Sequence, residues 1–256
     1  PLYTVRAELF LGGEFLDVKE LRIGLRTLTV SREKDAWGEE FAFCVNGVKI
    51  FAKGADYIPE DCIYSKITPE RIYELLDTAV ACHFNCIRIW GGGYYPADVF
   101  YDYCDEHGLI VWQDFMYACN VYELTDALRE SIIEETKDNV KRLRHHASLG
   151  LWCGNNEMES AWDHWGGFND HSDALKQDYL TMFEKLIPEA LKSEDDATFY
   201  WPSSHHPAVI LRTRTAMISG IVITGMYGME KSRFLTMKIT ISDFAQNLDS
   251  SRSLVK

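Results

Sequence analysis

The chain has 256 residues, of which 46% are hydrophobic and 25% are charged, an ordinary balance for a globular protein. Its formal net charge of −13 argues against nucleic acid as a partner, because phosphate binding needs a basic surface. No apolar run approaches the ~20 residues that a membrane-spanning helix needs, so no membrane partner is predicted. The seven cysteines are odd in number and contain no CxxC pair, which predicts neither a zinc site nor a disulfide framework.

The first 30 residues are rich in β-forming side chains. The segments YTVRAELFL and LRIGLRTLTV predict strands with a turn between them. Two or three strands cannot form a core alone, so we expect residues 1–30 to be the end of a β-domain whose beginning precedes Pro1.

From Val48 onward the pattern alternates between strands and helices. Thr68 and Pro69 begin one predicted helix as N-cap and first helical residue, and Pro96 and Gly108 begin and end the next. Apolar residues at helical spacing predict two more helices, over 128–143 and 175–186. The predicted strands are VKIFAKGADYI, NCIRIW, LIVWQDF, SLGLWCGNNE and TFYW. Repeated β/α units indicate a parallel sheet, either part of a (β/α)8 barrel or doubly wound.

Polar and aromatic residues at the strand ends favour the barrel. Barrel enzymes place their chemistry at the carboxyl ends of many strands, whereas a doubly wound sheet uses the one or two ends at its switch point. Here all five predicted strands contribute, with Asp56, Arg88, Trp90, Gln113, Asp114, Asn156, Glu157 and Trp201 at or just after their ends.

Glu157 is the strongest candidate for acid–base chemistry. It follows a buried strand, and partly apolar surroundings favour the protonated form of a carboxyl group, as a general acid requires. Asn156 beside it could donate a hydrogen bond to a substrate hydroxyl. Alternatively, the cluster caps the helix that follows. Glu159 fits better on the side of that helix.

Three other features have competing interpretations. Arg88 on an inward strand needs an anionic partner, so it either orients a catalytic carboxylate or forms a structural ion pair with Asp56 or Asp114. The triple glycine at 91–93 lacks the spacing of a phosphate loop and predicts a tight strand exit. His145 and His146 are adjacent and fit a basic helix C-terminus better than a ligand pair.

Several separated segments, in order, resemble the β-mannosidases of glycoside hydrolase family 2. They are GADYIPED, NCIRIWGGGYYPADVFYDYCDEHGLIVWQDFMYACNVY, RHHASLGLWCGNNEME and FYWPSS, and the likeness covers roughly residues 18 to 204. It implies part of a (β/α)8 TIM barrel, about five β/α units over residues 31–204, preceded by the end of an immunoglobulin-like β-sandwich in residues 1–30.

The resemblance also implies an activity and a site. It implies a retaining hydrolase that removes non-reducing terminal β-D-mannose from β-mannosides or manno-oligosaccharides, with Glu157 as general acid/base and Asn156 on the sugar 2-hydroxyl. No metal or cofactor is expected. The remaining sugar-subsite residues would be Asp56, Arg88, Trp90, Trp112, Gln113, Asp114 and Trp201.

Residues 205–256 do not continue the family pattern. The family's nucleophile is a Glu in a motif like SEFGFQS, which this chain lacks. Shifted by one frame, GIVITGMYGMEKSRF becomes compatible with the family's HYWDVWHG, and the nucleophile codon would straddle Gln246 and Asn247. We therefore predict that residues 205–256 are a frameshifted, non-native tail and that the chain as written is inactive.

Two alternatives stay open. One is a sister family 2 activity on galactose or glucuronic acid, and the other is a non-catalytic sugar-binding or inert remnant. The unpaired cysteines and the absence of any Asn-x-Ser/Thr sequon favour the bacterial cytoplasm over the lysosome.

Overall fold

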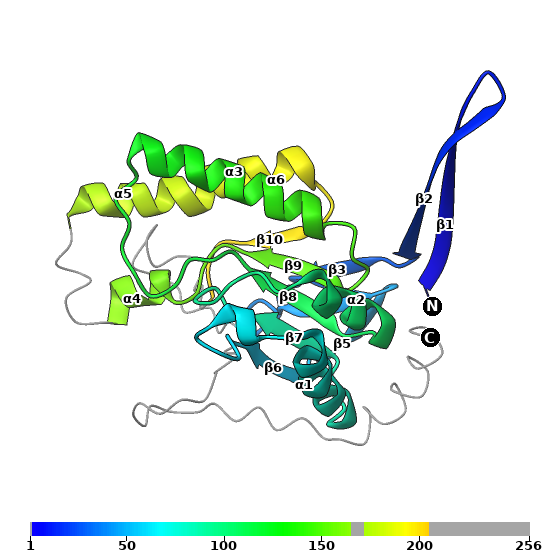
Figure 1. The fold of residues 1–256 in the computed structure, drawn as a ribbon. Coiled ribbons are helices and arrows are strands. Elements are labelled where there is room, and N and C mark those ends of the chain that lie inside the picture. Colours follow the sequence, from blue (N-terminus) through cyan, green and yellow to red (C-terminus); the bar gives the residue numbers. More distant parts are fainter. Residues whose placement is uncertain (1, 165–171, 205–256) are drawn as a thin grey trace.

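The computed structural model describes residues 2–164 and 172–204, and its centre is a five-stranded parallel sheet (Figure 1). The strand order is β10-β9-β8-β7-β6, so neighbours in the sheet are also successive in the chain. Their bounds are Gly54–Tyr57 (β6), Cys86–Ile89 (β7), Ile110–Asp114 (β8), Leu149–Cys153 (β9) and Phe199–Trp201 (β10).

A helical connection joins each pair of neighbouring strands, as parallel pairing requires. The helices are Pro69–Ala81 (α1), Asp98–His107 (α2), Asp126–Leu143 (α3), Met158–His164 (α4), Asp173–Thr181 (α5) and Ile187–Glu194 (α6). A 3-10 turn at Tyr64–Lys66 precedes α1, and a π-helical turn at Met182–Leu186 joins α5 to α6. The predicted alternation of strands and helices is therefore confirmed.

The helix ends follow the predicted signals with one difference. The Thr68 side chain accepts a hydrogen bond from the Arg71 amide at the start of α1, and Gly108 ends α2 in the left-handed conformation, with φ of 71°. Pro96 does not begin α2, which starts at Asp98 with Ala97 in extended backbone as its N-cap.

The segment VKIFAKGADYI is two strands instead of the one predicted. A second, antiparallel sheet has the order β3-β4-β5, with bounds Leu28–Ser31, Ala42–Val45 and Val48–Ile50. Asn46 and Gly47 both have positive φ, and this tight turn folds β5 back onto β4 before the chain enters β6.

Buried side chains alternate between the two faces of the parallel sheet. Val111 on β8 belongs to the larger core, between the sheet and the helices, while its neighbours Ile110 and Trp112 belong to a second core. Phe43 of β4 and the partly buried Val30 of β3 complete this second core. The antiparallel sheet therefore covers part of the face that the helices leave open.

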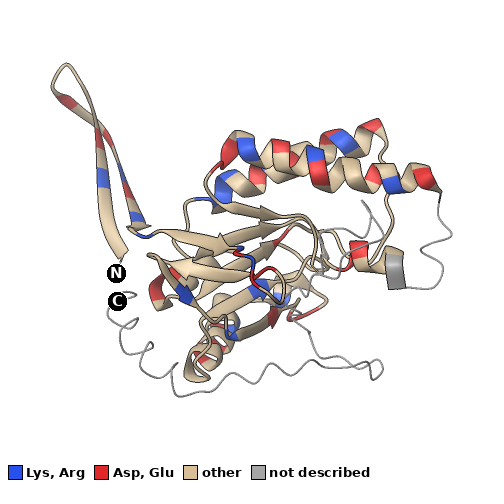
Figure 2. Ribbon diagram, turned by 180° about the vertical axis from the view of Figure 1, so that it is seen from behind, with Lys and Arg blue, Asp and Glu red and all other residues tan. Residues whose placement is uncertain are grey.

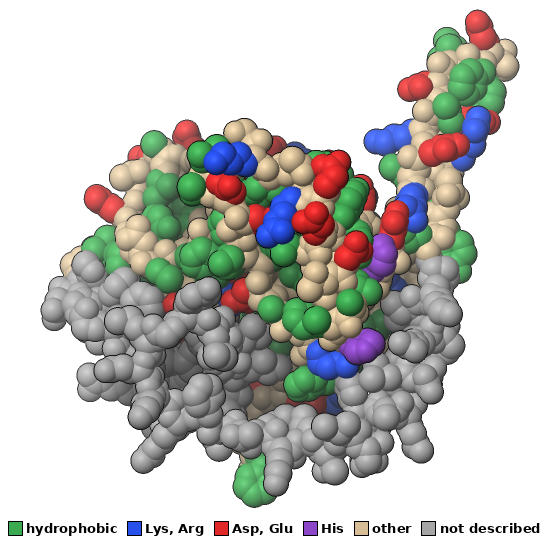
Figure 3. Space-filling model, turned by 60° about the horizontal axis from the view of Figure 1, so that its bottom comes forward, with side chains coloured by type: hydrophobic (Ala, Val, Ile, Leu, Met, Phe, Trp, Pro, Cys, Tyr) green, Lys and Arg blue, Asp and Glu red, His purple; other side chains and the backbone are tan. Residues whose placement is uncertain are grey.

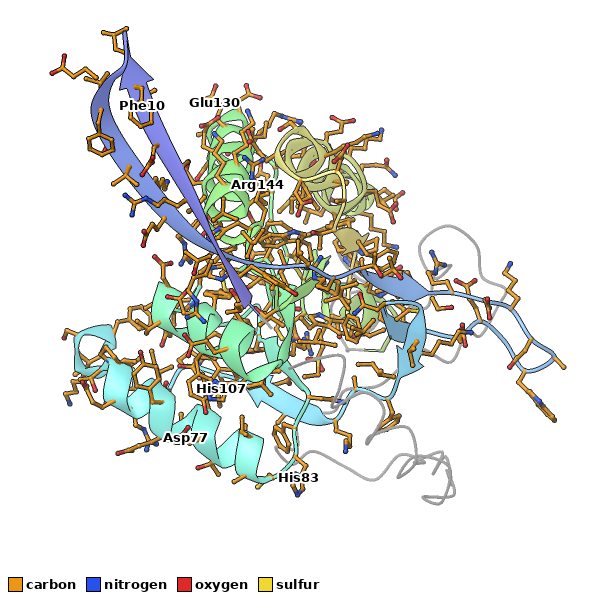
Figure 4. The ribbon with its side chains drawn as sticks, turned by 90° about the vertical axis from the view of Figure 1, so that its right-hand side faces the viewer. Phe10, Asp77, His83, His107, Glu130 and Arg144 are labelled. Carbon is orange, nitrogen blue, oxygen red and sulfur yellow. The ribbon has the colours of Figure 1, made fainter. Side chains whose placement is uncertain are left out.

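The N-terminal strands Leu2–Leu11 (β1) and Glu14–Gly24 (β2) form a hairpin that projects from this body. Figure 4 shows Phe10 near its tip, at the opposite end of the view from Asp77 on α1. Figure 3 shows apolar side chains along the arm, where Leu9, Leu11 and Phe15 are more than half exposed. The segment LRIGLRTLTV is therefore divided between the end of β2 and β3.

Charged residues lie mainly on the helices and the hairpin, while the ribbons of the parallel sheet are mostly uncharged (Figure 2). All seven cysteines are free thiols. Within the described residues, no helix is long and apolar enough to span a membrane. The predicted frameshifted tail, residues 205–256, lies outside the described residues.

Candidate active site

The carboxyl ends of the five parallel strands bring a set of charged and amide side chains together. Asp56 lies on β6, Arg88 on β7 and Asp114 at the end of β8, while Asn156 and Glu157 follow β9. Asp56 is paired in register with Arg88 across the two strands. Parallel strands end at the same edge of the sheet, which explains why residues so far apart in sequence meet here.

Arg88 is the centre of this set. Its guanidinium donates to both carboxylate oxygens of Asp114, from Nε at 3.2 Å and from Nη2 at 2.7 Å. Nη2 also donates to Asn156 Oδ1 at 2.8 Å. Burial lowers the pKa of Arg88, but the charge and hydrogen bonds of Asp114, together with the charge of Asp56, raise it by more, so the net shift is upward. The predicted ion pair is therefore present, and it also orients Asn156.

Asp114 has no oxygen left for a ligand. It is fully buried, and besides Arg88 it accepts hydrogen bonds from the Trp112 indole at 2.9 Å and the Gly91 amide at 2.9 Å. A carboxylate has about four lone-pair directions, and these four donors occupy them. Asp114 therefore acts on the site through Arg88 and Trp112.

Asp56 differs from Asp114 in keeping an oxygen free. Its Oδ1 lies 3.7 Å from Arg88 Nη1, beyond hydrogen-bond distance, and is buried without a hydrogen-bond partner. Burial raises the pKa of Asp56, Arg88 opposes this, and the nearby Asp114 and Glu157 carboxylates add to the increase. A buried acceptor of this kind is expected to be satisfied by a ligand hydroxyl or an ordered water.

Glu157 stands at the exit of β9 in an uncommon backbone conformation, with φ of 59°. Its amide donates to the Ser204 carbonyl, and its own carbonyl accepts from Ala161 in α4. The side chain that caps α4 is Asn155, whose Oδ1 accepts from the Met158 amide at 3.2 Å. The partly exposed Glu157 carboxyl is therefore not used as the cap, and its Oε2 lies 3.6 Å from the Cys119 thiol.

Asn156 is held by both ends of its amide. Oδ1 accepts from Arg88, and Nδ2 donates to Cys119 Sγ at 3.4 Å. An amide NH₂ has two hydrogens, so one more donor remains on Nδ2 beyond the contact with sulfur.

The candidate tryptophans occupy different depths. Trp112 is only 4% exposed, and Arg88 lies over its ring, 5.7 Å from the centroid. Trp90 is partly exposed at the end of β7. Trp201 contacts Phe41 at 5.0 Å between ring centroids and lies under the Arg32 guanidinium at 4.8 Å. Tryptophan side chains of different exposure therefore lie at or near the ends of β7, β8 and β10.

Comparison with known proteins gives the same family as the sequence segments. Beta-mannosidase B of Aspergillus fumigatus is 40% identical over 210 residues, which are 79% of this chain and 25% of that protein. Beta-mannosidase B of Thermothelomyces thermophilus is 38% identical over 213 residues, 80% of this chain and 25% of that protein. The crystal structure of β-D-mannosidase from Dictyoglomus thermophilum matches with a TM-score of 0.71 and 35% identity, over 78% of this chain and 24% of that chain. The resemblance to the β-mannosidases is confirmed.

This relationship covers only part of those proteins. The chain spans about a quarter of the length of the curated β-mannosidases that it matches. A β-glucuronidase from Parabacteroides merdae matches with a TM-score of 0.62 at 18% identity, which shows a shared fold alone. No family model matches the chain.

Gln113 is not brought to the cluster, although the β-mannosidase resemblance implied a sugar contact. It is fully buried, and its Oε1 accepts from Tyr101 of α2 at 2.6 Å while Nε2 donates to the Asp114 carbonyl. Its side chain therefore lies on the helix-covered face of β8, opposite Trp112 and Asp114. Glu159 is also buried, at 3% exposure, on α4.

The triple glycine is a tight strand exit, as predicted. A Cβ atom on Gly91 would lie 2.6 Å from the Phe115 carbonyl oxygen and 2.9 Å from that of Tyr117. This close approach lets the Gly91 amide reach Asp114, so the glycine supports the cluster instead of binding phosphate.

Sequence reasoning missed two contributors to the cluster, Asn155 and Cys119. Asn155 caps α4, and it also accepts a hydrogen bond from Ser203 and donates one to the Pro202 carbonyl, tying β9 to β10. Cys119 touches both Asn156 and Glu157. Its position after a strand end, within the β-mannosidase-like segment FMYACNVY, was the available signal.

His146 lies outside the cluster, just after the end of α3, and contacts Asp105. Its Nδ1 lies 2.8 Å from Asp105 Oδ2, and the other oxygen of Asp105 accepts from the Ser148 amide. Asp102, Asp105 and His146 have ligand atoms within 4.8 Å of one another, the one such group among the described residues. It lies before the start of β9, away from the cluster, and its contacts fit a structural pair.

Proposed function

We propose that the chain carries the acid/base half of a retaining β-mannosidase site, with Glu157 as general acid and base. The observation that carries the proposal is the position of the Glu157 carboxyl beside the buried Arg88–Asp114–Asn156 network. This carboxyl is partly exposed, and it does not cap α4, because Asn155 does. The 40% identity to a β-mannosidase supports mannose as the sugar.

In this proposal the side chains divide the chemistry. Retaining hydrolysis uses two carboxyl groups roughly 5–5.5 Å apart, one as acid/base and one as nucleophile. In a complete site, Glu157 would donate its proton to the glycosidic oxygen while the second carboxylate bonds to the anomeric carbon and the glycosidic bond breaks. Glu157 would then take a proton from the water that displaces this carboxylate and releases the sugar. The remaining donor of Asn156 Nδ2 faces the 2-hydroxyl, and the unpartnered Asp56 Oδ1 accepts from another hydroxyl.

The second carboxylate is the missing part of the proposal. The chain contains no SEFGFQS-like motif, and residues 205–256 are proposed to be read in a shifted frame. We therefore expect the chain as written to bind mannose without turning over mannosides. Resequencing the DNA across the codons for residues 203–207 tests the frameshift: a gained or lost base restores the frame, and an intact frame contradicts it.

The same proposal extends to the fold. The five parallel strands are taken as the first part of a (β/α)8 barrel over residues 31–204, and residues 1–30 as the end of an immunoglobulin-like sandwich. The exposed apolar side chains of the β1–β2 hairpin support a missing β-partner. The proposed compartment is the bacterial cytoplasm.

Two alternatives make different predictions. A sister family 2 activity would prefer glucuronate or galactose, but the matched β-glucuronidase is 18% identical against 35% for the β-D-mannosidase structure. The other alternative is a non-catalytic remnant, which the absent nucleophile motif favours. An inert remnant would bind no mannose, whereas a sugar-binding remnant would bind it and would gain no activity on an aryl β-mannoside after the reading frame is restored.

Tryptophan fluorescence during sugar titration separates these functions. We expect mannose to change the emission of Trp90 and Trp112, and glucuronate and galactose to have little effect. Asp56→Asn should weaken mannose binding roughly tenfold, because it removes the charge and turns one of the two acceptor oxygens into a donor. Glu134→Gln on the exposed face of α3 is the matched control. Absence of mannose binding would overturn the sugar site, and hydrolysis of an aryl β-mannoside at family-like rates would overturn the missing nucleophile.

A further inference from the structure

The Cys119 thiol and the Glu157 carboxyl form a close pair at the strand ends. Cys119 Sγ donates to Glu157 Oε2 at 3.6 Å and accepts from Asn156 Nδ2 at 3.4 Å. The thiol is therefore bound on one side by the amide that Arg88 orients and on the other by the proposed acid/base.

Backbone contacts fix the two residues against each other. The Cys119 amide donates to the Asn156 carbonyl at 3.1 Å, and the Asn156 amide donates to the Tyr117 carbonyl at 2.9 Å. Cys119 and Glu157 both have positive φ, of 49° and 59°. Non-glycine residues rarely adopt this conformation, and where it is kept it tends to mark functional sites.

We propose that Cys119 is a positioning residue for Glu157, holding its carboxyl in the orientation from which it would protonate a glycosidic oxygen. The inference rests on the proposed function of Glu157. A thiol is a weak donor, so it fixes the direction of the carboxyl group while leaving its proton exchangeable with a substrate. A stronger donor such as Lys or Arg would hold the ionised form and hinder proton return.

The thiol and the carboxyl are close enough to influence each other's ionisation. Partial burial raises the pKa of Cys119 and the Glu157 carboxylate raises it further, while Arg88 and the contact from Asn156 oppose this. Among the described residues, Tyr122 is another titratable group near enough to the thiol to be influenced by it. At neutral pH the sulfur therefore stays protonated and able to donate.

Site-resolved alkylation of the whole chain tests the pair without any sugar. Cys119 is exposed, so iodoacetamide labelling followed by peptide mass spectrometry can report its reactivity from pH 6 to pH 10. Replacing the carboxylate with an amide in Glu157→Gln removes a unit charge near 4 Å, which should lower the midpoint pH of Cys119 labelling by at least about 0.7 unit. Glu157→Asp keeps the negative charge but places it farther from the thiol, so a smaller decrease in the midpoint pH is expected.

Cys82 provides the internal control. It is exposed at the end of α1, and its labelling should be identical in all three proteins if they are folded alike. A Cys119 midpoint that stays unchanged in Glu157→Gln, with Cys82 also unchanged, would overturn the pairing.

The readout separates this inference from the proposed function. A shifted midpoint in a chain that does not bind mannose would retain the Cys119–Glu157 pair and overturn the sugar site. Mannose binding with no shift would retain the sugar site and overturn the positioning role. In a chain that has both, saturating mannose should slow Cys119 labelling and leave Cys82 unaffected.

Discussion

Replacing Arg88 with methionine should be among the most damaging single changes in the chain. The Arg88 guanidinium is 3% exposed and donates three hydrogen bonds, two to Asp114 and one to Asn156. Arg88→Met would leave the Asp114 carboxylate buried at 0% exposure without its counter-charge. Breaking a buried ion pair from one side costs about 3–5 kcal/mol, a large fraction of the ~5–15 kcal/mol that stabilises a typical domain.

Urea unfolding followed by far-ultraviolet circular dichroism measures this loss. The matched control is Lys137→Met, which removes an ion pair with Glu134 at 3.8 Å on the exposed side of α3 and should cost at most ~0.5 kcal/mol. Adding Asp114→Asn to Arg88→Met removes the orphaned charge, so the double variant should recover at least about 1 kcal/mol. Arg88→Met no less stable than Lys137→Met, or a double variant that loses the sum of its parts, would refute the reasoning.

Three further predictions concern packing, pH and thiols. Gly91→Ala should destabilise the chain by about 1–3 kcal/mol in the same urea assay, because its Cβ meets two backbone carbonyls, and equal stability would contradict the close approach. Burial raises the pKa of Asp56, so its ionised form opposes folding above the ordinary Asp value of about 4; Asp56→Asn should raise the urea midpoint at pH 7 and change it little near pH 3. A thiol reagent should label Cys62, Cys82 and Cys119 quickly and should reach Cys86, Cys104 and Cys153 only after unfolding. The last three are buried, and burial raises the pKa of each thiol, to about 12 for Cys86. Rapid labelling of any of these three would refute their burial.

The order of elements could be predicted from sequence because local signals mark it. Thr68 marks the start of α1 by its side-chain cap, and Gly108 marks the end of α2 by its left-handed backbone conformation. The spacing of apolar residues predicts helices from the local sequence alone. The division of VKIFAKGADYI into two strands was missed because each half is β-forming. Which strand each half joins is decided by the Asn46–Gly47 turn and by pairing with β4, which are non-local.

The place of the site was also predictable, since parallel strands deliver their last residues to one edge. What a residue does there was less accessible. Cys119 has its partners 37 and 38 residues away, and Asn155 contacts Ser203 across 48 residues besides capping α4 locally. No periodicity or spacing reports such contacts. The alternative that Asn156 and Glu157 cap the following helix named the right role for the wrong residues. Asn155, one residue earlier, caps α4.

Gln113 shows why neighbouring strand-end residues should not be grouped by position alone. Every residue of β8 is buried, so its sequence carries no alternation of polar and apolar residues to show which face each side chain takes. The hydrogen-bond partners show which face each side chain takes: Gln113 bonds to Tyr101 of α2, and Asp114 bonds to Arg88.

Among the described residues of the cluster, few polar atoms are left for a ligand once these groups are set apart. Both oxygens of Asp114 are occupied by hydrogen bonds, and Asn156 is oriented by its hydrogen bond from Arg88. The atoms left to bind a ligand are Asp56 Oδ1 as an acceptor, one Asn156 N–H as a donor and the Glu157 carboxyl. An acceptor, a donor and an acid at one strand edge suit a polyhydroxylated ligand with an oxygen to protonate. Replacing Arg88 should therefore lower the free energy of unfolding, whereas replacing Asp56 should weaken sugar binding without destabilising the fold.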